Sequence, residues 1–387
     1  MAVNAGRPEP VPLRTVEPSE VAAALASSLR GGSPIAPLPT DPIDRAAAIA
    51  ALQPWEPVTE SDTVAVLATS GSTGARKGVV LSGEAIRASA EATHLWLGGL
   101  GDWVLALPSH YIAGFMVLAR ACLAATRAMP IRSDLNDLPE VVGALSPRRY
   151  ISLVPPQLDR ALRRHDVADA LASFSAVLVG GGPISDDLVK RARLAGIHVV
   201  KTYGMTETCG GCVYDGQPLP GVDIELDDDD RIMIRSNSLF SGYRLRRDLT
   251  DELLKDGWFR TQDRGNRDGG RLAVLGRCDD VVVTGGHKVD LGEVDRCVQH
   301  WATDQDAHAA VLGVPDAVWG TVIIAVSDVP GSLDDLQALV CRSLPGYAMP
   351  RELIYLNPLP WLANGKPDRV AITSMVVEML DKRQAPV

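Results

Sequence analysis

The stretch TSGSTGARKG, residues 69–78, is the most informative part of this 387-residue chain. It follows an apolar, β-branched run at residues 63–67 and precedes a segment of helical spacing at residues 82–96. Three glycines and four hydroxyl residues predict a flexible loop between a strand and a helix. Such a loop can direct backbone N–H groups and hydroxyls at a phosphate, and Lys77 adds a positive charge. The alternative interpretation is a plain turn that caps a helix.

This loop differs from the P-loop of nucleoside triphosphatases. That loop has the pattern G-x-x-x-x-G-K-[ST], with a glycine before the lysine and a hydroxyl residue after it. Here Arg76 and Gly78 occupy those two positions. The loop therefore predicts phosphate binding without specifying the nucleotide chemistry.

Composition and charge narrow the class of protein. Hydrophobic residues make up 46% of the chain, which is typical of a globular protein of two or three units. The formal net charge of −10 argues against a nucleic-acid partner, so an anionic substrate needs locally placed basic groups. We find no apolar run long enough for a membrane span, and residues 1–12 lack the pattern of a secretion signal. We expect a cytoplasmic protein.

The six cysteines are too scattered for a disulfide scaffold. Cys209 and Cys212 form one C-x-x-C pair, which could be half of a zinc or redox site. Because no second pair or H-x₃-H motif accompanies it, buried, reduced thiols are the favoured interpretation.

The order of patterns predicts an α/β fold. Residues 1–60 are rich in proline and alanine, with one amphipathic helix near residues 19–29. Between residues 63 and 201, short apolar runs alternate with helical segments, which indicates βαβ units and a mostly parallel sheet flanked by helices. A β-rich subdomain follows at residues 221–275, where four aspartates at 227–230 predict a solvated hairpin tip, not a metal site. The remainder predicts a small α+β domain.

Two more loops follow predicted strands, where an open α/β sheet binds its ligands. They are GGGP at residues 180–183 and YGMTET at residues 203–208. Tyr203 could stack on a planar ring, Thr206 offers a hydroxyl for a phosphate, and Glu207 offers an oxygen for Mg²⁺. Each loop also has a structural interpretation, as a tight turn, a core tyrosine or a helix cap.

Six motifs in order resemble the adenylate-forming superfamily of acyl- and aryl-CoA ligases, peptide-synthetase adenylation domains and luciferases. They are TSGSTGARKG (69–78), GGGP (180–183), YGMTET (203–208), GWFRTQDRG (257–265), GRCDDVVVTGGHKVDLGEVD (276–295) and NGKPDR (364–369). The resemblance covers residues 60–370. It implies an N-terminal domain at residues 1–276 that binds ATP and the acid, a mobile C-terminal domain at residues 277–387, and a hinge near Asp279.

The resemblance also implies how ATP is bound. Its β- and γ-phosphates would contact Thr69, Ser70, Gly71, Ser72, Thr73, Gly74 and Lys77. Adenine would pack against Tyr203, with the turn at Gly181 and Gly182 beneath it. Asp263 would accept hydrogen bonds from both ribose hydroxyls, and Arg277 would also contact the ribose. Gln262 stands where the family usually has glycine, which puts a bulkier side chain near the ribose.

Two half-reactions follow from the resemblance. Thr206 would contact the α-phosphate, Glu207 would bind Mg²⁺, and Lys366 would bridge the acid carboxylate and the α-phosphate as charge builds up. The C-terminal domain would then turn about its hinge, so that Gly285 and Gly286 leave room for the thin arm of CoA. The neighbouring His287 replaces an acidic or amide residue that is frequent in the family, so its role stays open.

The identity of the acid depends on residues 108–114, PSHYIAG, which resemble the substrate-side loop of acyl- and aryl-CoA ligases. Ser109 and His110 would line the acyl pocket; a core histidine is the alternative for His110. The short segment before residue 69 resembles the abbreviated actinobacterial o-succinylbenzoate–CoA ligases of menaquinone biosynthesis. The predicted substrates are therefore o-succinylbenzoate, ATP and CoA. The cation that recognises the second carboxylate of this acid is not evident from sequence.

The sequence also allows other functions. Another aryl- or acyl-CoA ligase would keep every motif, and a stand-alone amino-acid adenylating enzyme would transfer to a carrier thiol. A nonenzymatic nucleotide-binding homologue is disfavoured because Lys366, Glu207 and Asp263 are all present. The oligomeric state is open, with a homodimer among the alternatives.

Overall fold

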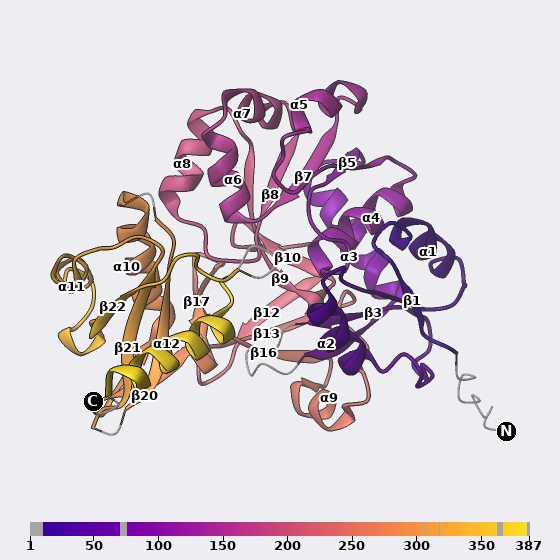
Figure 1. Ribbon diagram of the computed structural model, residues 1–387. Helices are drawn as coiled ribbons and strands as arrows, with labels where there is room; N and C mark the ends of the chain where they lie inside the picture. The colour runs from indigo at the N-terminus through magenta and orange to yellow at the C-terminus, as the bar shows by residue number, and fades with distance from the viewer. Residues whose placement is uncertain (1–10, 70–75, 306, 317, 362–366, 385–387) are drawn as a thin grey trace. The chain divides into compact units, whose positions relative to one another are not determined.

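The structure, a computed structural model, describes residues 11–69, 76–305, 307–316, 318–361 and 367–384. Its chain is α/β, as predicted, and divides into two compact units (Figure 1). The first unit comprises Met1–Glu225, Met233–Arg260 and Asp268–Leu272, and the second Leu226–Ile232, Thr261–Arg267 and Ala273–Val387. The predicted domain boundary after residue 276 stays a prediction. The predicted hinge at Asp279 also stays a prediction. In the described part of the chain, every helix is too short or too polar to cross a membrane.

The first unit begins with a five-stranded sheet in the order β1–β2–β3–β4–β14. Its strands are β1 (Arg14–Val16), β2 (Ile35–Pro37), β3 (Thr63–Thr69), β4 (Lys77–Ser82) and β14 (Gly242–Tyr243). The buried run of β3 alternates between two hydrophobic clusters, because successive side chains of a strand point to opposite faces. On one face pack α1 (Val21–Ser28), α3 (Gly83–Trp96) and α4 (Ile112–Ala124), and on the other α2 (Pro42–Leu52).

One expectation about the phosphate loop is wrong. We predicted that residues 69–78 connect a strand to a helix, but β4 lies between the loop and α3 and pairs antiparallel with β3. The loop therefore joins two strands of a hairpin, and α3 begins only after its N-cap, Ser82. The physical reason is that KGVVLS is a short buried run, which pairs with β3 instead of extending the helix.

The first unit also contains a seven-stranded sheet in the order β11–β10–β9–β8–β7–β5–β6. The strands β5 to β9 run parallel, as predicted, while β10 and β11 are antiparallel additions. They are β5 (Asp102–Leu105), β6 (Ala128–Pro130), β7 (Arg149–Leu153), β8 (Ala176–Val179), β9 (Val199–Met205), β10 (Gly210–Tyr214) and β11 (Gln217–Pro218). On one face lie α5 (Leu138–Val141), α6 (Pro155–Leu162), α7 (His165–Ala172) and α8 (Asp186–Leu194) (Figure 1).

The predicted β-rich segment is a sheet in the order β12–β13–β16–β15, with β17 paired to β16. Its strands are β12 (Val222–Leu226), β13 (Arg231–Ser236), β15 (Leu254–Lys255), β16 (Trp258–Asp268) and β17 (Arg271–Arg277), and α9 (Arg247–Leu253) precedes β15. The aspartates at 227–230 form the tip between β12 and β13, where the Asp227 N–H donates to the Arg231 carbonyl at 3.0 Å. The predicted hairpin tip is confirmed.

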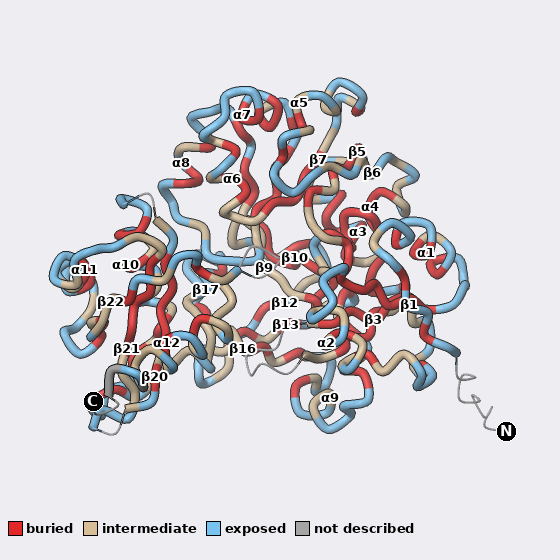
Figure 2. The backbone as a smooth tube through the Cα atoms, in the orientation of Figure 1, coloured by how far each residue is buried: buried red, intermediate tan, exposed pale blue. Residues whose placement is uncertain are grey.

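The second unit contains a sheet in the order β19–β18–β21–β20, with β22 paired to β21. Its strands are β18 (Val281–Thr284), β19 (His287–Asp290), β20 (Ala309–Asp316), β21 (Gly320–Ser327) and β22 (Glu352–Tyr355). Alternate residues of β20 and β21 face α10 (Leu291–Asp304) and α11 (Leu333–Val340) on one side and α12 (Arg369–Gln384) on the other. Figure 2 shows much of β20 and β21 as buried.

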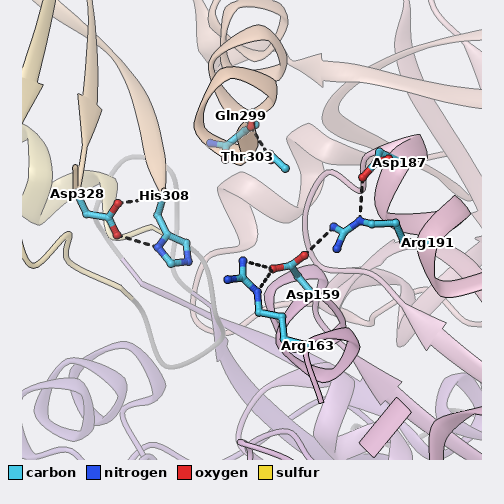
Figure 3. Close-up of polar contacts among 8 residues, drawn as sticks. All are labelled: Asp159, Arg163, Asp187, Arg191, Gln299, Thr303, His308 and Asp328. Carbon is cyan, nitrogen blue, oxygen red and sulfur yellow. Dashed lines mark hydrogen bonds and ion pairs between the residues drawn. The ribbon is translucent and has the colours of Figure 1, made fainter. Parts of the chain in front are cut away.

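Polar contacts of carboxylates link neighbouring elements in each unit (Figure 3). In the first unit, Asp159 on α6 accepts hydrogen bonds from Arg163 at 3.0 Å and from Arg191 on α8 at 2.7 Å. Burial alone would raise the pKa of Asp159, but these two guanidinium groups outweigh it and lower the pKa. In the second unit, Asp328 accepts from the His308 backbone and ring, each at 2.8 Å, where β20 begins and β21 ends.

Candidate functional site

The phosphate loop is anchored at both ends by the β3–β4 hairpin. Thr69 and Lys77 are register partners, and the Thr69 hydroxyl donates to the Lys77 carbonyl at 3.4 Å. The following residue, Gly78, accepts a backbone hydrogen bond from Arg244 at 2.8 Å. The other predicted phosphate contacts, Ser70, Gly71, Ser72, Thr73 and Gly74, lie outside the described residues.

Lys77 and Glu207 meet at one side chain, Tyr243. The Lys77 Nζ lies 5.3 Å from the centroid of the Tyr243 ring, within cation–π range. The Tyr243 hydroxyl donates to Glu207 Oε1 at 2.9 Å, and the Phe240 N–H donates to the Glu207 carbonyl at 2.8 Å. The structure thus brings together the cation predicted for phosphate and the carboxylate predicted for metal. Sequence reasoning missed Tyr243; the only signal was its place in a short apolar stretch after the β-rich hairpin.

Thr206 and Glu207 lie in a short 3₁₀ turn, Thr206–Thr208, directly after β9. Close approach of β9 and β10 sets this turn. A side chain at Gly204 would place its Cβ 2.0 Å from the Gly210 carbonyl oxygen, so only glycine fits there. The Thr208 hydroxyl donates to the same carbonyl at 2.6 Å, and Thr206 is buried.

The GGGP turn lies against the strand that carries Tyr203. A Cβ at Gly180 would be 2.2 Å from the Thr202 hydroxyl oxygen, and that hydroxyl donates to the Val179 carbonyl at 3.3 Å. Gly181 has a φ of +81°, which favours glycine. The predicted adenine contacts therefore come from two neighbouring places: Tyr203 lies in β9, and Gly181 and Gly182 follow the adjacent strand β8.

The predicted ribose contacts meet in the second unit. Arg277 Nη1 lies 3.5 Å from Asp263 Oδ1, and its Nε donates to Asp279 Oδ1 at 2.8 Å. Although burial opposes it, the hydrogen bond to Asp279 raises the pKa of Arg277. The Asp263 N–H donates to the Thr261 hydroxyl at 3.0 Å. Asp263, Arg277 and the predicted hinge residue Asp279 thus form one charged cluster.

The predicted CoA turn connects β18 to β19. Gly285 and Gly286 have φ values of +56° and +82°, and they link the register pair Thr284 and His287 as a two-residue hairpin turn. The Gly285 N–H donates to the Trp319 carbonyl at 3.0 Å. The Trp319 ring is 40% exposed.

Aromatic and cationic side chains surround this turn. The Arg351 guanidinium carbon lies 3.5 Å from the Trp319 ring centroid. His287 stacks on Tyr347, with ring centroids 4.2 Å apart and planes 5° apart. His287 therefore packs against an aromatic ring, and its role in the reaction stays open.

Ser109 and His110 are buried at the beginning of α4. Burial lowers the pKa of His110 to about 4, so its ring is neutral at pH 7. Both ring nitrogens are buried and lack a hydrogen-bond partner among the described residues. The predicted catalytic residue Lys366 lies outside the described residues.

Arg120 on α4 is a buried cation that the sequence did not single out. It is 3% exposed, and its Nε has no hydrogen-bond partner among the described residues. Its guanidinium carbon lies 5.1 Å from the Trp103 ring centroid, and its Nη2 would be 3.7 Å from a Cβ at Gly210. Within the described chain, no carboxylate forms an ion pair with it. An arginine within an apolar helix was the only sequence signal.

The carboxylate that this site offers suits a magnesium ion that is coordinated mainly by the phosphates of a nucleotide. Among the described residues, no three His, Cys, Asp or Glu side chains cluster as a metal cage. A single carboxylate, Glu207, fits Mg²⁺, which usually takes one or two carboxylates together with phosphates and water. Cys209 and Cys212 are buried thiols, and burial raises the pKa of Cys209 to about 12.

Comparison with known proteins shows the family to which the chain is related. The AMP-binding enzyme family matches residues 13–244, and the AMP-binding enzyme C-terminal domain matches residues 304–366. A protein of Mycobacterium tuberculosis named probable 2-succinylbenzoate–CoA ligase is 40% identical over 362 residues, which are 90% of this chain and 93% of that protein. The 2-succinylbenzoate–CoA ligase of Enterococcus faecalis is 31% identical over 81% of this chain and 70% of its own length.

Solved structures agree with this relationship. The o-succinylbenzoate coenzyme A synthetase (MenE) of Bacillus subtilis, in complex with ATP and magnesium ion, has a TM-score of 0.71 at 27% identity, covering 80% of this chain and 70% of that one. The same enzyme in complex with the acyl-adenylate intermediate OSB-AMP has a TM-score of 0.74 at 25% identity, covering 93% of this chain and 82% of that one.

Proposed function

The chain belongs to the AMP-binding enzyme family, and from this premise we propose that it is an ATP-dependent acid–CoA ligase acting on o-succinylbenzoate. The enzyme forms an acyl-adenylate and then the CoA thioester, a step of menaquinone biosynthesis. We place this activity in the cytoplasm. The relatives named for this reaction support the assignment, and the observation in the structure that carries the choice of acid is Arg120.

Arg120 suits an acid with two carboxylates. One carboxylate of o-succinylbenzoate reacts with ATP, and the other remains an anion that the pocket must bind. A buried guanidinium without an acidic partner is costly, and an incoming carboxylate offsets that cost by ion pairing. Gly210 packs beside the Arg120 guanidinium, where a Cβ would lie 3.7 Å from Nη2. We therefore assign the second carboxylate to Arg120, while Ser109 and His110 stay predicted residues of the acyl pocket.

The first unit would activate the acid. Lys77 and the hydroxyl of Thr69 bind the phosphates that leave as pyrophosphate, and Thr206 contacts the α-phosphate. Magnesium, held through Glu207, would neutralise charge on the phosphates. Tyr203 packs on adenine above Gly181 and Gly182. The acid carboxylate attacks the α-phosphorus, and Lys366 stabilises the charge that builds up there.

The second unit would bind the ribose and CoA. Asp263 accepts from the ribose hydroxyls, and Arg277 supports it. We assign CoA to the surface around Gly285 and Gly286. There the half-exposed Trp319 ring can stack on a base, and Arg351 can pair with a phosphate. The thiol then attacks the acyl carbon and expels AMP.

Release of AMP and pyrophosphate with a panel of acids, with and without CoA, tests this function. We expect brisk pyrophosphate release with o-succinylbenzoate, and AMP release coupled to thioester formation once CoA is added. A Lys366→Ala variant should lose pyrophosphate release. Turnover of benzoate or a fatty acid with none of o-succinylbenzoate would reject the assigned acid, and wild-type pyrophosphate release by the variant would reject the role of Lys366.

A further inference from the structure

The segment that contains Tyr243 contacts two parts of the ATP site that are far apart in sequence. Tyr243 is 4% exposed and pairs with Val79 of β4, two residues after Lys77. The next residue, Arg244, donates its N–H to the Gly78 carbonyl at 2.8 Å. On the other side, Phe240 donates its N–H to the Glu207 carbonyl at 2.8 Å. This segment therefore links the phosphate hairpin to the turn that carries Glu207.

The Tyr243 side chain contacts two opposite charges in different ways. Its hydroxyl, 2.9 Å from Glu207 Oε1, makes a charge-assisted hydrogen bond that fixes the direction of the carboxylate. Its ring face, 5.3 Å from Lys77 Nζ, attracts the ammonium group and limits where it can lie. One tyrosine thus orients both groups.

The tyrosine itself is held firmly. Its N–H donates to the Thr250 hydroxyl at 2.8 Å, and its ring packs edge-on against Phe240, with centroids 4.8 Å apart. Thr250 holds the backbone of Tyr243 and Phe240 packs against its ring, so its hydroxyl and its ring face are oriented without a ligand. A side chain with this support can organise its partners in advance of binding.

We propose that Tyr243 is a positioning residue of the ATP–magnesium site, whose hydroxyl orients Glu207 for Mg²⁺ and whose ring orients Lys77 for the phosphates. This inference rests on the proposed function, which assigns those two roles. It predicts that the two halves of the tyrosine are separable. Loss of the hydroxyl should weaken the binding of Mg²⁺, and loss of the ring should also weaken the binding of ATP.

The test compares Tyr243→Phe, which keeps the ring, with Tyr243→Leu, which removes both features. Tyr150→Phe is the matched control, because Tyr150 is also buried and its hydroxyl donates to the Gly99 carbonyl at 2.9 Å. ATP binding is measured by calorimetry while Mg²⁺ is varied, ATP–pyrophosphate exchange is measured with o-succinylbenzoate, and urea unfolding checks the fold.

For Tyr243→Phe we expect the Mg²⁺ concentration at half-saturation to rise about tenfold, the loss of one charged hydrogen bond, with the KM for ATP at saturating Mg²⁺ changed less than about twofold. Tyr243→Leu should in addition raise that KM by about three- to tenfold. Tyr150→Phe should change neither quantity.

Three outcomes would overturn the proposal. They are a wild-type Mg²⁺ dependence in Tyr243→Phe, equal shifts in Tyr243→Phe and Tyr150→Phe, and a shift in Tyr243→Phe that adds fully to that of Glu207→Gln in the double variant. If wild-type protein binds ATP and Mg²⁺ but shows no exchange with any acid, the proposed function fails while the positioning role is still measured by calorimetry.

Discussion

Replacement of Arg120 by methionine should have opposite effects on stability and on catalysis. Arg120 is 3% exposed, and burial lowers the pKa of its guanidinium. Without a ligand, the described residues offer it no carboxylate, only the Trp103 ring at 5.1 Å. Methionine has a similar length and no charge. The variant should therefore be more stable than wild type. Its free energy of unfolding should be about 1–2 kcal/mol higher, after allowing for the lost cation–π contact.

Catalysis should fall because the bound substrate loses its partner. Removing one member of a buried ion pair costs about 2–5 kcal/mol, which corresponds to a fall in kcat/KM of at least about 30-fold. The matched substrate is 4-oxo-4-phenylbutanoate, which keeps the reacting carboxylate and lacks the one on the ring. With this monoacid the variant should match wild type within about threefold or exceed it, because no ion pair is lost.

The assay is pyrophosphate release with both acids, alongside urea unfolding of the free protein. Arg132→Met is the control, since Arg132 is exposed and paired with Asp134. If Arg120→Met lowered kcat/KM equally for the two acids, the result would show that Arg120 does not bind the second carboxylate. A free protein less stable than wild type would contradict the claim that the buried cation lacks a partner.

Three further predictions concern stability. Gly285→Ala should lower the free energy of unfolding by about 1–2 kcal/mol, because its φ is +56° and a Cβ would lie 2.8 Å from the Trp319 ring; an unchanged urea midpoint would contradict this. Arg244→Met should cost about 3 kcal/mol, since the buried guanidinium donates to the carbonyls of residues 52, 53, 56 and 57, and Arg244→Lys, with fewer donors, should cost less. Burial lowers the pKa of His94 and of His110 to about 4, so the unfolded chain takes up protons first as the pH falls below about 6.5. Stability should thus fall by about 2 kcal/mol per histidine between pH 7 and pH 5, and His94→Asn with His110→Asn should flatten that slope in urea unfolding; an equal slope would refute the assignment.

Much of the fold was predictable because its signals are local. The strands near Val104, Ile151 and Val177 and helix α8 follow from apolar runs and helical spacing that are read within a few residues. The three-residue strands β1 and β2 were missed because they are too short for any period to show. Strand β4 was missed for a different reason: its partner, β3, decides that KGVVLS is extended.

In the candidate site, too, some features were predictable from the sequence and others were not. Order and residue type were enough to predict Lys77, Glu207, Asp263 and Arg277, because each carries a group that the chemistry of ATP requires. Their pairing was not predictable, since Tyr243 contacts Glu207 from 36 positions away. Contacts over such separations depend on how sheets and helices pack, which residue spacing does not encode.

The sequence by itself determined the family and the residue types available for adenylation, because these depend on short, ordered motifs. Tertiary structure alone decided that Arg120 is buried with no acidic partner among the described residues and that one tyrosine contacts both Lys77 and Glu207. The physical reason is that burial and pairing are properties of packing. A charge costs little on the surface and much in the interior, and only the folded chain shows on which side it lies.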